Sequence, residues 1–168
     1  MQCGRYAGYM KILGIDPGYE RLGIAILEKN KGDKKEKVVY SDCFKTSAKI
    51  SFVERLEFLG REIERIIALY KPDGLAIETL FFQNNQKTAM NVAEVRGMIL
   101  YLAKCAGLTI QEFTPLQVKV AVAGHGQGDK RAVTDMVCKL VVIEKEIKHD
   151  DEYDAIAIAL TGFACAQW

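Results

Sequence analysis

Two short apolar runs, each ending in a carboxylate, constrain the fold of this chain more than any other feature. The first is Lys11-Ile-Leu-Gly-Ile-Asp16, followed at once by Pro17-Gly18, and the second is Leu75-Ala-Ile-Glu78. Apolar runs of about four to eight residues bounded by turn signals are typical of strands buried on both faces. We therefore expect two buried strands, each presenting an acid at its carboxyl end.

The remaining patterns predict a mixed sheet with helices on its faces. Residues 22–27 and 38–44 are expected to form strands around a lysine-rich hairpin, and residues 108–113 a further strand. Apolar residues at three- and four-residue spacing predict a helix from Val53 to Tyr70, which Pro72 closes. Helical composition marks residues 88–106, 115–123, 131–142 and about 151–164. The sequence thus predicts an α/β fold with a five-stranded mixed sheet flanked by helices.

Length and composition limit the classes of protein further. The chain has 168 residues, and its 23 Lys and Arg nearly balance its 22 Asp and Glu, which gives a net charge of +1. This length predicts a single domain over residues 10–168, with residues 1–9 as an extension or a disordered tail. The near-neutral balance offers no overall attraction to nucleic acid, but it leaves open whether the two signs are segregated.

Cysteine usage and hydropathy indicate where the protein works. The five cysteines are odd in number, widely spaced and without a C-x-x-C pair, which favours reduced, mostly buried thiols over disulfides or a zinc site. The longest uncharged run near the end, residues 155–166, is shorter than the roughly 20 residues of a membrane helix. We therefore expect a cytoplasmic protein without membrane contact.

Two further acids fall at the start of the last predicted helix. Asp151 and Asp154 are three residues apart and share a helical face. Asp150, four residues before Asp154, can share that face as well, so spacing alone leaves both open. Taken singly, each acid is equally compatible with a helix cap or a surface charge. If the helix docks beside the two buried strands, however, these acids converge with Asp16 and Glu78.

Such a cluster of carboxylates predicts bound cations, because several ionised acids cannot share a small site without compensation. With no His or Cys at ligand spacing, an all-oxygen site favours Mg²⁺, with Mn²⁺ as a possible substitute. Two such ions about 4 Å apart form a clamp suited to phosphodiester hydrolysis.

The predicted helix over residues 88–106 carries a stripe of small residues. Ala89, Ala93 and Gly97 lie four residues apart on one face, which allows another helix to approach closely. The partner is either a neighbouring element of the same chain or the same helix in a second copy of the chain.

Several blocks, in order from about residue 11 to 160, resemble the RuvC family of bacterial Holliday-junction resolvases. They are Ile12-Leu-Gly-Ile-Asp-Pro-Gly18, Ala76-Ile-Glu78 followed by Phe81, the segment from Asn85 through Arg96-Gly97, Gln117-Val-Lys119, Lys130, and Asp151-x-x-Asp-Ala-x-Ala-Ile-Ala159. The resemblance implies a ribonuclease H-like fold and a homodimer that nicks two strands of a four-way DNA junction symmetrically. It also implies that Asp16, Glu78, Asp151 and Asp154 are catalytic and bind the divalent metal, without a covalent enzyme intermediate.

The resemblance further implies contacts with DNA. Phe81 matches an aromatic that stacks on unpaired bases at the junction centre, and Lys119 and Lys130 match lysines that contact DNA near the active site. Arg131 is a weaker candidate, because a basic residue at a helix start opposes the helix dipole. His149 either assists the metal or plays an indirect or surface role. The family also suggests cooperation with the RuvA and RuvB branch-migration proteins.

Three other interpretations remain open. A related nuclease could act on a different structured nucleic acid, and a junction-binding protein could lack catalysis, although the four acids argue against that. The Gly-Ile-Asp-Pro-Gly block also resembles the phosphate loop of actin-like ATPases, but 168 residues leave little room for their second lobe.

Overall fold

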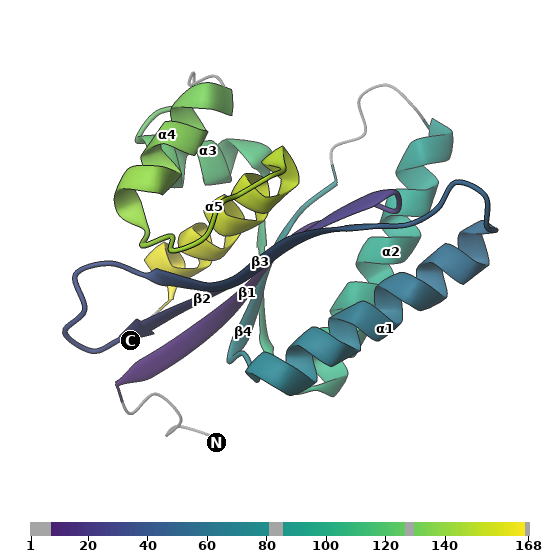
Figure 1. Ribbon diagram of the computed structural model, residues 1–168, viewed down its shortest axis with the longest axis horizontal. Helices are drawn as coiled ribbons and strands as arrows, with labels where there is room; N and C mark the ends of the chain where they lie inside the picture. The colour runs from purple at the N-terminus through teal and green to yellow at the C-terminus, as the bar shows by residue number, and fades with distance from the viewer. Residues whose placement is uncertain (1–7, 81–85, 127–129, 167–168) are drawn as a thin grey trace.

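A computed structural model of the protein describes residues 8–80, 86–126 and 130–166. Over these residues the chain forms five strands and five helices (Figure 1). The strands are β1 (Tyr9–Asp16), β2 (Arg21–Asn30), β3 (Lys37–Lys45), β4 (Gly74–Glu78) and β5 (Thr109–Phe113). The helices are α1 (Phe52–Tyr70), α2 (Gln86–Cys105), α3 (Pro115–Ala123), α4 (Lys130–Leu140) and α5 (Asp150–Cys165). The expected elements are confirmed with shifted ends: β1 and α2 begin two residues earlier than predicted, β2 ends three residues later, and α4 ends two residues earlier.

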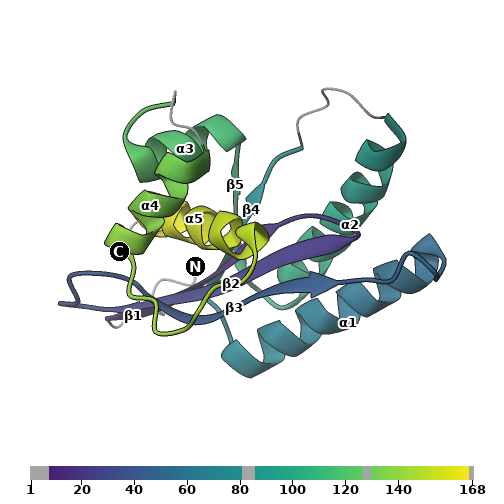
Figure 2. The same cartoon turned by 45° about the horizontal axis from the view of Figure 1, so that its top comes forward.

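The five strands form one mixed sheet in the order β3-β2-β1-β4-β5. Strands β1 to β3 are antiparallel neighbours, whereas β4 runs parallel to both β1 and β5. Helices α1 and α2 cover one face, and α3, α4 and α5 cover the other (Figures 1 and 2). The predicted α/β architecture is therefore confirmed as three layers, with the central strands buried between two layers of helices.

Local sequence signals explain where the helices begin and end. Ser51 and Glu54 form a capping box at the start of α1, and Lys71 ends it in the left-handed conformation just before Pro72. Thr114 and Gln117 form a second capping box at the start of α3. Backbone N–H groups that the helices cannot pair internally are thus satisfied by neighbouring side chains.

The core is divided by the sheet into two clusters. Alternating side chains of β1 point to opposite faces, so that Ile12 packs with α5 while Leu13 and Ile15 pack with α1 and α2. This double burial is the reason that the run Ile12 to Ile15 is continuously apolar.

Helix α5 lies unusually close to the sheet, because two glycines face it. A Cβ atom added to Gly14 would lie 2.2 Å from the carbonyl oxygen of Ala155, and one added to Gly23 would lie 2.3 Å from that of Asp151. Gly23 is paired with Asp16 in the ladder between β1 and β2. The first turn of α5 therefore rests beside the carboxyl end of β1.

Among the described cysteines, burial is less common than we predicted. Only Cys43 is buried, whereas Cys105, Cys138 and Cys165 are exposed, and all four are free thiols. The expectation of mostly buried thiols is wrong for these three because their helical positions face away from the sheet. No helix in the described ranges is long and apolar enough to cross a membrane.

The close approach of α5 predicts that Gly14→Ala destabilises the protein. The new methyl group would meet backbone atoms of α5 that cannot move independently, and overpacking of this kind costs about 1–3 kcal/mol or more. Chemical denaturation measures the change. Gly60→Ala is the control: its methyl group would meet the flexible end of Met98, and loss of a helical glycine should stabilise by about 0.5–1 kcal/mol. Equal stability of the two variants would contradict the prediction.

Candidate active site

Two of the expected acids lie side by side at one edge of the sheet. Ile15 of β1 pairs with Ile77 of the parallel strand β4, so Asp16 and Glu78, the next residues, leave the two strands together. Neighbouring strands are about 4.8 Å apart. The parallel arrangement of β1 and β4 therefore brings together two carboxylates that are 62 positions apart in the chain.

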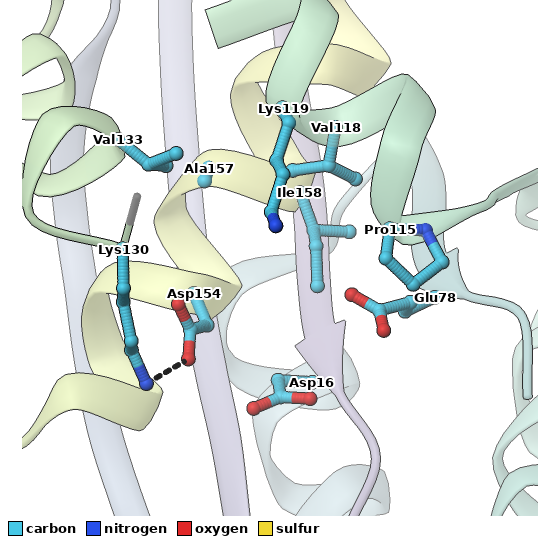
Figure 3. Close-up of a pocket in the computed structure, with 10 residues that line it drawn as sticks. All are labelled: Asp16, Glu78, Pro115, Val118, Lys119, Lys130, Val133, Asp154, Ala157 and Ile158. Atoms are coloured by element: carbon cyan, nitrogen blue, oxygen red, sulfur yellow. Dashed lines mark ion pairs between the residues drawn. The ribbon is translucent and has the colours of Figure 1, made fainter. Parts of the chain in front are cut away.

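Helix α5 adds a third acid to this edge. Asp154 faces Asp16 and Glu78 across a cleft of about 260 Å³ (Figure 3). The cleft is lined by Asp16, Glu78, Pro115, Val118, Lys119, Lys130, Val133, Asp154, Ala157 and Ile158. Its lining combines five apolar residues with five charged ones, and the low-dielectric apolar walls strengthen the electrostatic effects of the charged groups.

Burial and neighbouring acids raise the pKa of two of the acids, Asp16 and Glu78. Burial, followed by the charges of Asp154, Glu78 and Asp151, raises the pKa of Asp16 to about 7, and Lys130 offsets only part of this. Burial and the charge of Asp154 also raise the pKa of Glu78, against the influence of Lys119. The carboxylates therefore lack sufficient positive charge from the described residues to stay ionised without cost.

The two expected lysines reach the cleft, from α3 and from the start of α4. Lys130 Nζ lies 2.9 Å from Asp154 Oδ2 and 3.7 Å from Asp150 Oδ2. Its hydrogen bond to Asp154 raises the pKa of Lys130. The side chain of Lys119 points into the cleft from α3 (Figure 3). Arg131 is exposed beside Lys130, outside the lining of the cleft, and Phe81 lies outside the described residues.

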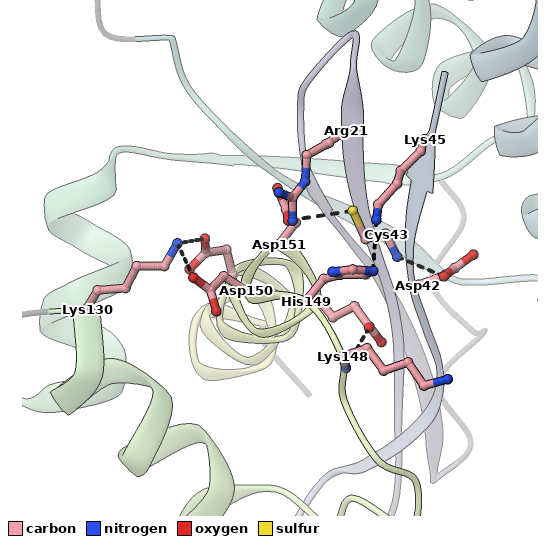
Figure 4. Close-up of polar contacts among 11 residues, drawn as sticks. Arg21, Asp42, Cys43, Lys45, Lys130, Lys148, His149, Asp150 and Asp151 are labelled. Atoms are coloured by element: carbon pink, nitrogen blue, oxygen red, sulfur yellow. Dashed lines mark hydrogen bonds and ion pairs between the residues drawn. The ribbon is translucent and has the colours of Figure 1, made fainter. Parts of the chain in front are cut away.

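The structure separates the two candidates at the start of α5. The side chain of Asp150 is 79% exposed, whereas that of Asp151 is 20% exposed and lies near enough to raise the pKa of Asp16. Asp151 forms an ion pair with Arg21 of β2 and accepts a hydrogen bond from the Cys43 thiol, with a distance of 3.5 Å from Sγ to Oδ2 (Figure 4). The burial and the partners of Asp151 place it at the edge of the acidic site, whereas Asp150 faces solvent.

The donor set of the site suits a hard divalent cation, although the acids do not converge in this conformation. Within the described part of the chain, no three His, Cys, Asp or Glu side chains are close enough to hold a metal ion as they stand. Two of the acids are instead paired with Lys130 and Arg21. A cation would relieve the repulsion that raises the pKa of Asp16, and carboxylate oxygens are the ligands that Mg²⁺ and Mn²⁺ prefer.

His149 points away from the acids. Its Nε2 lies 3.0 Å from Lys45 Nζ (Figure 4), and its side chain makes no capping hydrogen bond at the start of α5.

Three residues of the site were not predicted from the sequence. Arg21 pairs with Asp151, and Arg96 of α2 donates from Nε to the carbonyl oxygen of Glu78 at 3.1 Å. Glu152 is buried between Asp151 and Asp154 in the sequence. A signal existed for Glu152, because an acid beside a continuous apolar segment needs a buried partner. Arg96 lies in one of the segments that resemble the family, but only its hydrogen bond to Glu78 shows what it does.

The site has acids at the ends of the neighbouring strands β1 and β4, and a helix that crosses the mixed sheet carries further acids opposite them. This arrangement defines the ribonuclease H-like class of nucleases. Residues 12–162 match the family model described as "Crossover junction endodeoxyribonuclease RuvC". The chain belongs to the RuvC family. The crossover junction endodeoxyribonuclease RuvC of Desulfitobacterium hafniense is 44% identical over 90% of each chain, and that of Thermosipho melanesiensis is 43% identical over 89% of this chain and 94% of the relative.

Solved structures agree with this assignment. RuvC of T. thermophilus in complex with a Holliday junction substrate superposes with a TM-score of 0.83 at 32% identity, covering 90% of this chain and 92% of that one. The yeast mitochondrial Holliday junction resolvase Ydc2 superposes with a TM-score of 0.69 at 12% identity, covering 89% and 76% of the two chains, and it shares the fold. The ribonuclease H-like fold expected from the sequence is therefore confirmed.

The raised pKa of Asp16 predicts how the metal-free protein responds to pH. Between the usual carboxyl value of 3.8 and about 7, the folded state retains a proton that the unfolded state has released. Stability should therefore fall as the pH rises through this range. Asp16→Asn should abolish most of that fall and raise the melting temperature at pH 8, because each pKa unit corresponds to about 1.4 kcal/mol.

Thermal melts in the presence of a chelator, at pH 5 and pH 8, measure this effect. A gain of 1 kcal/mol raises the melting temperature by about 2–4 °C in a protein of this size. Asp135→Asn, at an exposed position of α4 outside the cleft, is the matched control and should follow the wild type. The same loss of stability toward pH 8 in Asp16→Asn would contradict the prediction.

Proposed function

We propose that this protein resolves Holliday junctions in DNA recombination and repair, by hydrolysing one phosphodiester in each of two strands. The observation that carries the proposal is the cleft that Asp16, Glu78 and Asp154 line together with Lys119 and Lys130. Acids that lack compensating charge call for a cation, and lysines at the rim suit a phosphate backbone. Membership of the RuvC family supports a junction as the substrate.

In this proposal Asp16, Glu78, Asp151 and Asp154 are the catalytic acids and hold divalent cations, Mg²⁺ or Mn²⁺, of which two per site suit the reaction. When bound, these ions would activate a water molecule and stabilise charge on the leaving oxygen. For their ligands to converge, Asp154 must turn from Lys130 and Asp151 from Arg21. Arg96 holds the end of β4 through the Glu78 carbonyl oxygen and so limits the positions of the Glu78 side chain.

Lys119, Lys130 and Arg131 are the proposed contacts with DNA phosphates, and Phe81 is the proposed stacking residue. Lys119 and Lys130 support this because both border the cleft from its α3 and α4 side. Exposed Arg131 extends the same positive rim. A lysine released from a carboxylate keeps its charge for a phosphate, so Lys130 can serve the acids and DNA in turn.

Junction cleavage by wild type and Asp16→Asn tests the function. Removal of a residue that only hydrogen-bonds to a metal ligand typically lowers activity by about 10–100-fold. Loss of a ligand itself should therefore lower the cleavage rate by more than about 100-fold. Binding to the junction in a gel-shift assay should persist. The assay uses labelled four-way junctions with Mg²⁺, beside duplex, flap and RNA substrates.

Asp135→Asn serves as the control in this assay and should cut like the wild type. Cleavage that persists in Asp16→Asn would overturn the proposed site. Preference for another substrate would favour a related nuclease, and metal-independent binding without cutting would favour a junction-binding protein.

We also propose that two copies assemble through α2. Ala89 and Ala93 are half-buried, and Gly97 is exposed: apart from its own helical backbone and chain neighbours, no heavy atom of the described residues lies within 4 Å of an added Cβ. Met90 and Tyr101, 64% and 68% exposed, continue this face at helical spacing. An apolar stripe around small residues suits close packing of two helices, and a two-fold dimer would supply one site for each of two cuts.

Gly97→Arg tests the dimer. The free space at Gly97 should leave the fold intact, whereas a charged side chain should raise the dimer dissociation constant by at least about tenfold, equivalent to 1.4 kcal/mol. Analytical ultracentrifugation measures association, and circular dichroism checks the fold. Gly97→Ala, which adds only a methyl group, is the matched control. An unchanged dimer in Gly97→Arg would exclude this face.

Three further proposals complete the assignment. Residues 10–168 form the nuclease domain, with residues 1–9 as an extension, which the match over residues 12–162 supports. The protein acts in the cytoplasm, and RuvA and RuvB are proposed partners on the strength of family membership.

A further inference from the structure

Glu152 is a buried acid in the first turn of α5, directly between the two proposed metal-binding residues of that helix. It is 3% exposed. Its carboxylate accepts hydrogen bonds from Ser41 Oγ at 2.8 Å, from Lys145 Nζ at 2.6 Å and from the backbone nitrogen of Lys148 at 3.2 Å. A buried carboxylate is costly unless it is fully paired, and Glu152 meets that condition.

These partners come from two elements that flank α5. Ser41 belongs to β3, and Lys145 and Lys148 lie in the segment between α4 and α5. Lys145 Nζ also donates to the carbonyl oxygen of Ser41 at 2.6 Å, which closes the cluster. Burial alone would raise the pKa of Glu152, but the hydrogen bonds from Lys145, Ser41 and Lys148 hold it below its usual value. The cluster therefore ties strand, connecting segment and helix together through charge-assisted bonds.

Because Glu152 lies on the same helical turn as Asp151 and Asp154, holding its side chain also restrains theirs. Successive residues are rotated by about 100° about the helix axis, so Asp151 lies about 100° to one side of Glu152 and Asp154 about 160° away from it. A rotation of the first turn by a given angle would carry both aspartates with it. Fixing Glu152 on β3 thus fixes the direction in which Asp151 and Asp154 leave the helix.

The usual anchor of a helix start is absent from this position. His149, the N-cap residue of α5, makes no side-chain capping hydrogen bond, and its ring contacts Lys45 instead. Gly14 and Gly23 set how closely α5 approaches the sheet, and the buried residues from Ala155 to Phe163 hold the body of the helix. The side chain of Glu152 adds a restraint in the first turn, before those residues begin.

We propose that Glu152, held by Ser41 and Lys145, is a positioning residue that sets the rotation of α5 so that Asp151 and Asp154 converge with Asp16 and Glu78 on the metal ions. Glu152 touches neither metal nor DNA in this role. The inference rests on the proposed function, because it concerns the metal site of that reaction.

Three substitutions, made in the full chain, remove different parts of the cluster. Glu152→Ala removes all three hydrogen bonds, and Ser41→Ala removes one and keeps the ion pair. Glu152→Gln keeps the length and one acceptor oxygen, but it removes the charge and replaces the second acceptor with an NH₂ donor. Two readouts are measured: Mn²⁺ binding without DNA, by electron paramagnetic resonance, and junction cleavage as a function of Mg²⁺ concentration.

Glu152→Ala should raise the Mn²⁺ dissociation constant and the half-saturating Mg²⁺ concentration by about tenfold or more, as is typical for residues that orient metal ligands. Ser41→Ala and Glu152→Gln should shift both values in the same direction by less, because each variant keeps part of the cluster. Junction affinity without metal should stay unchanged. If Glu152→Ala does not fold, the shift in Ser41→Ala decides the matter.

Glu36→Gln is the matched control, because Glu36 is also largely buried, in an ion pair with Lys29 at 2.7 Å in the β2–β3 hairpin. Glu36→Gln should lower the melting temperature and leave the Mn²⁺ dissociation constant and the half-saturating Mg²⁺ concentration unchanged. The proposal would be overturned if Glu152→Ala and Ser41→Ala had lower melting temperatures but the wild-type Mn²⁺ dissociation constant and half-saturating Mg²⁺ concentration. Wild-type protein that binds Mn²⁺ but cuts no junction would overturn the proposed function alone, and wild-type protein that binds no Mn²⁺ would overturn both.

Discussion

The contact of α5 with β1 and β2 at two glycines is the constraint on which the rest of the structure depends. Gly14 and Gly23 leave no room for a side chain between the sheet and the backbone of α5. Because Gly23 pairs with Asp16, the carbonyl oxygen of Asp151 lies beside Asp16. A larger residue at either position would move the helix outward, and the acids of α5 would then lie farther from Asp16 and Glu78.

The site also depends on partial compensation of its negative charge by basic side chains. Several acids are gathered at a partly buried edge, which is unfavourable in itself, and basic side chains offset part of that cost: Lys130 pairs with Asp154, Arg21 with Asp151, and Lys119 acts on Glu78. The whole chain is close to neutral, with a net charge of +1. Basic and acidic side chains nevertheless lie next to one another at the site, and the basic ones that border the acids include those proposed to contact DNA.

Much of the fold could be predicted because its signals are local. The apolar runs before Asp16 and Glu78, the periodicity of α1 and the residues that end the helices all act within a few positions of one another. The contacts that were missed join distant positions: Arg21 and Asp151 are 130 residues apart, and Ser41 and Glu152 are 111 apart. Neither pair has a spacing pattern, since packing and not periodicity brings its members together. The cysteines illustrate the same limit, because residue type alone does not tell which helical face is covered.

By itself, the sequence determined the order of the elements, the acids at the ends of β1 and β4, and the pair of acids that α5 carries, because hydrophobic pattern and strand length decide these locally. Only the tertiary structure showed that Asp151 is largely buried and Asp150 exposed, since both spacings suit a helical face and only docking of α5 buries one of them. It also decided which basic residues meet which acids, and it placed Glu152 in a buried cluster. Those outcomes depend on the distance and rotation of α5 relative to the sheet, which arise from packing between segments far apart in the chain.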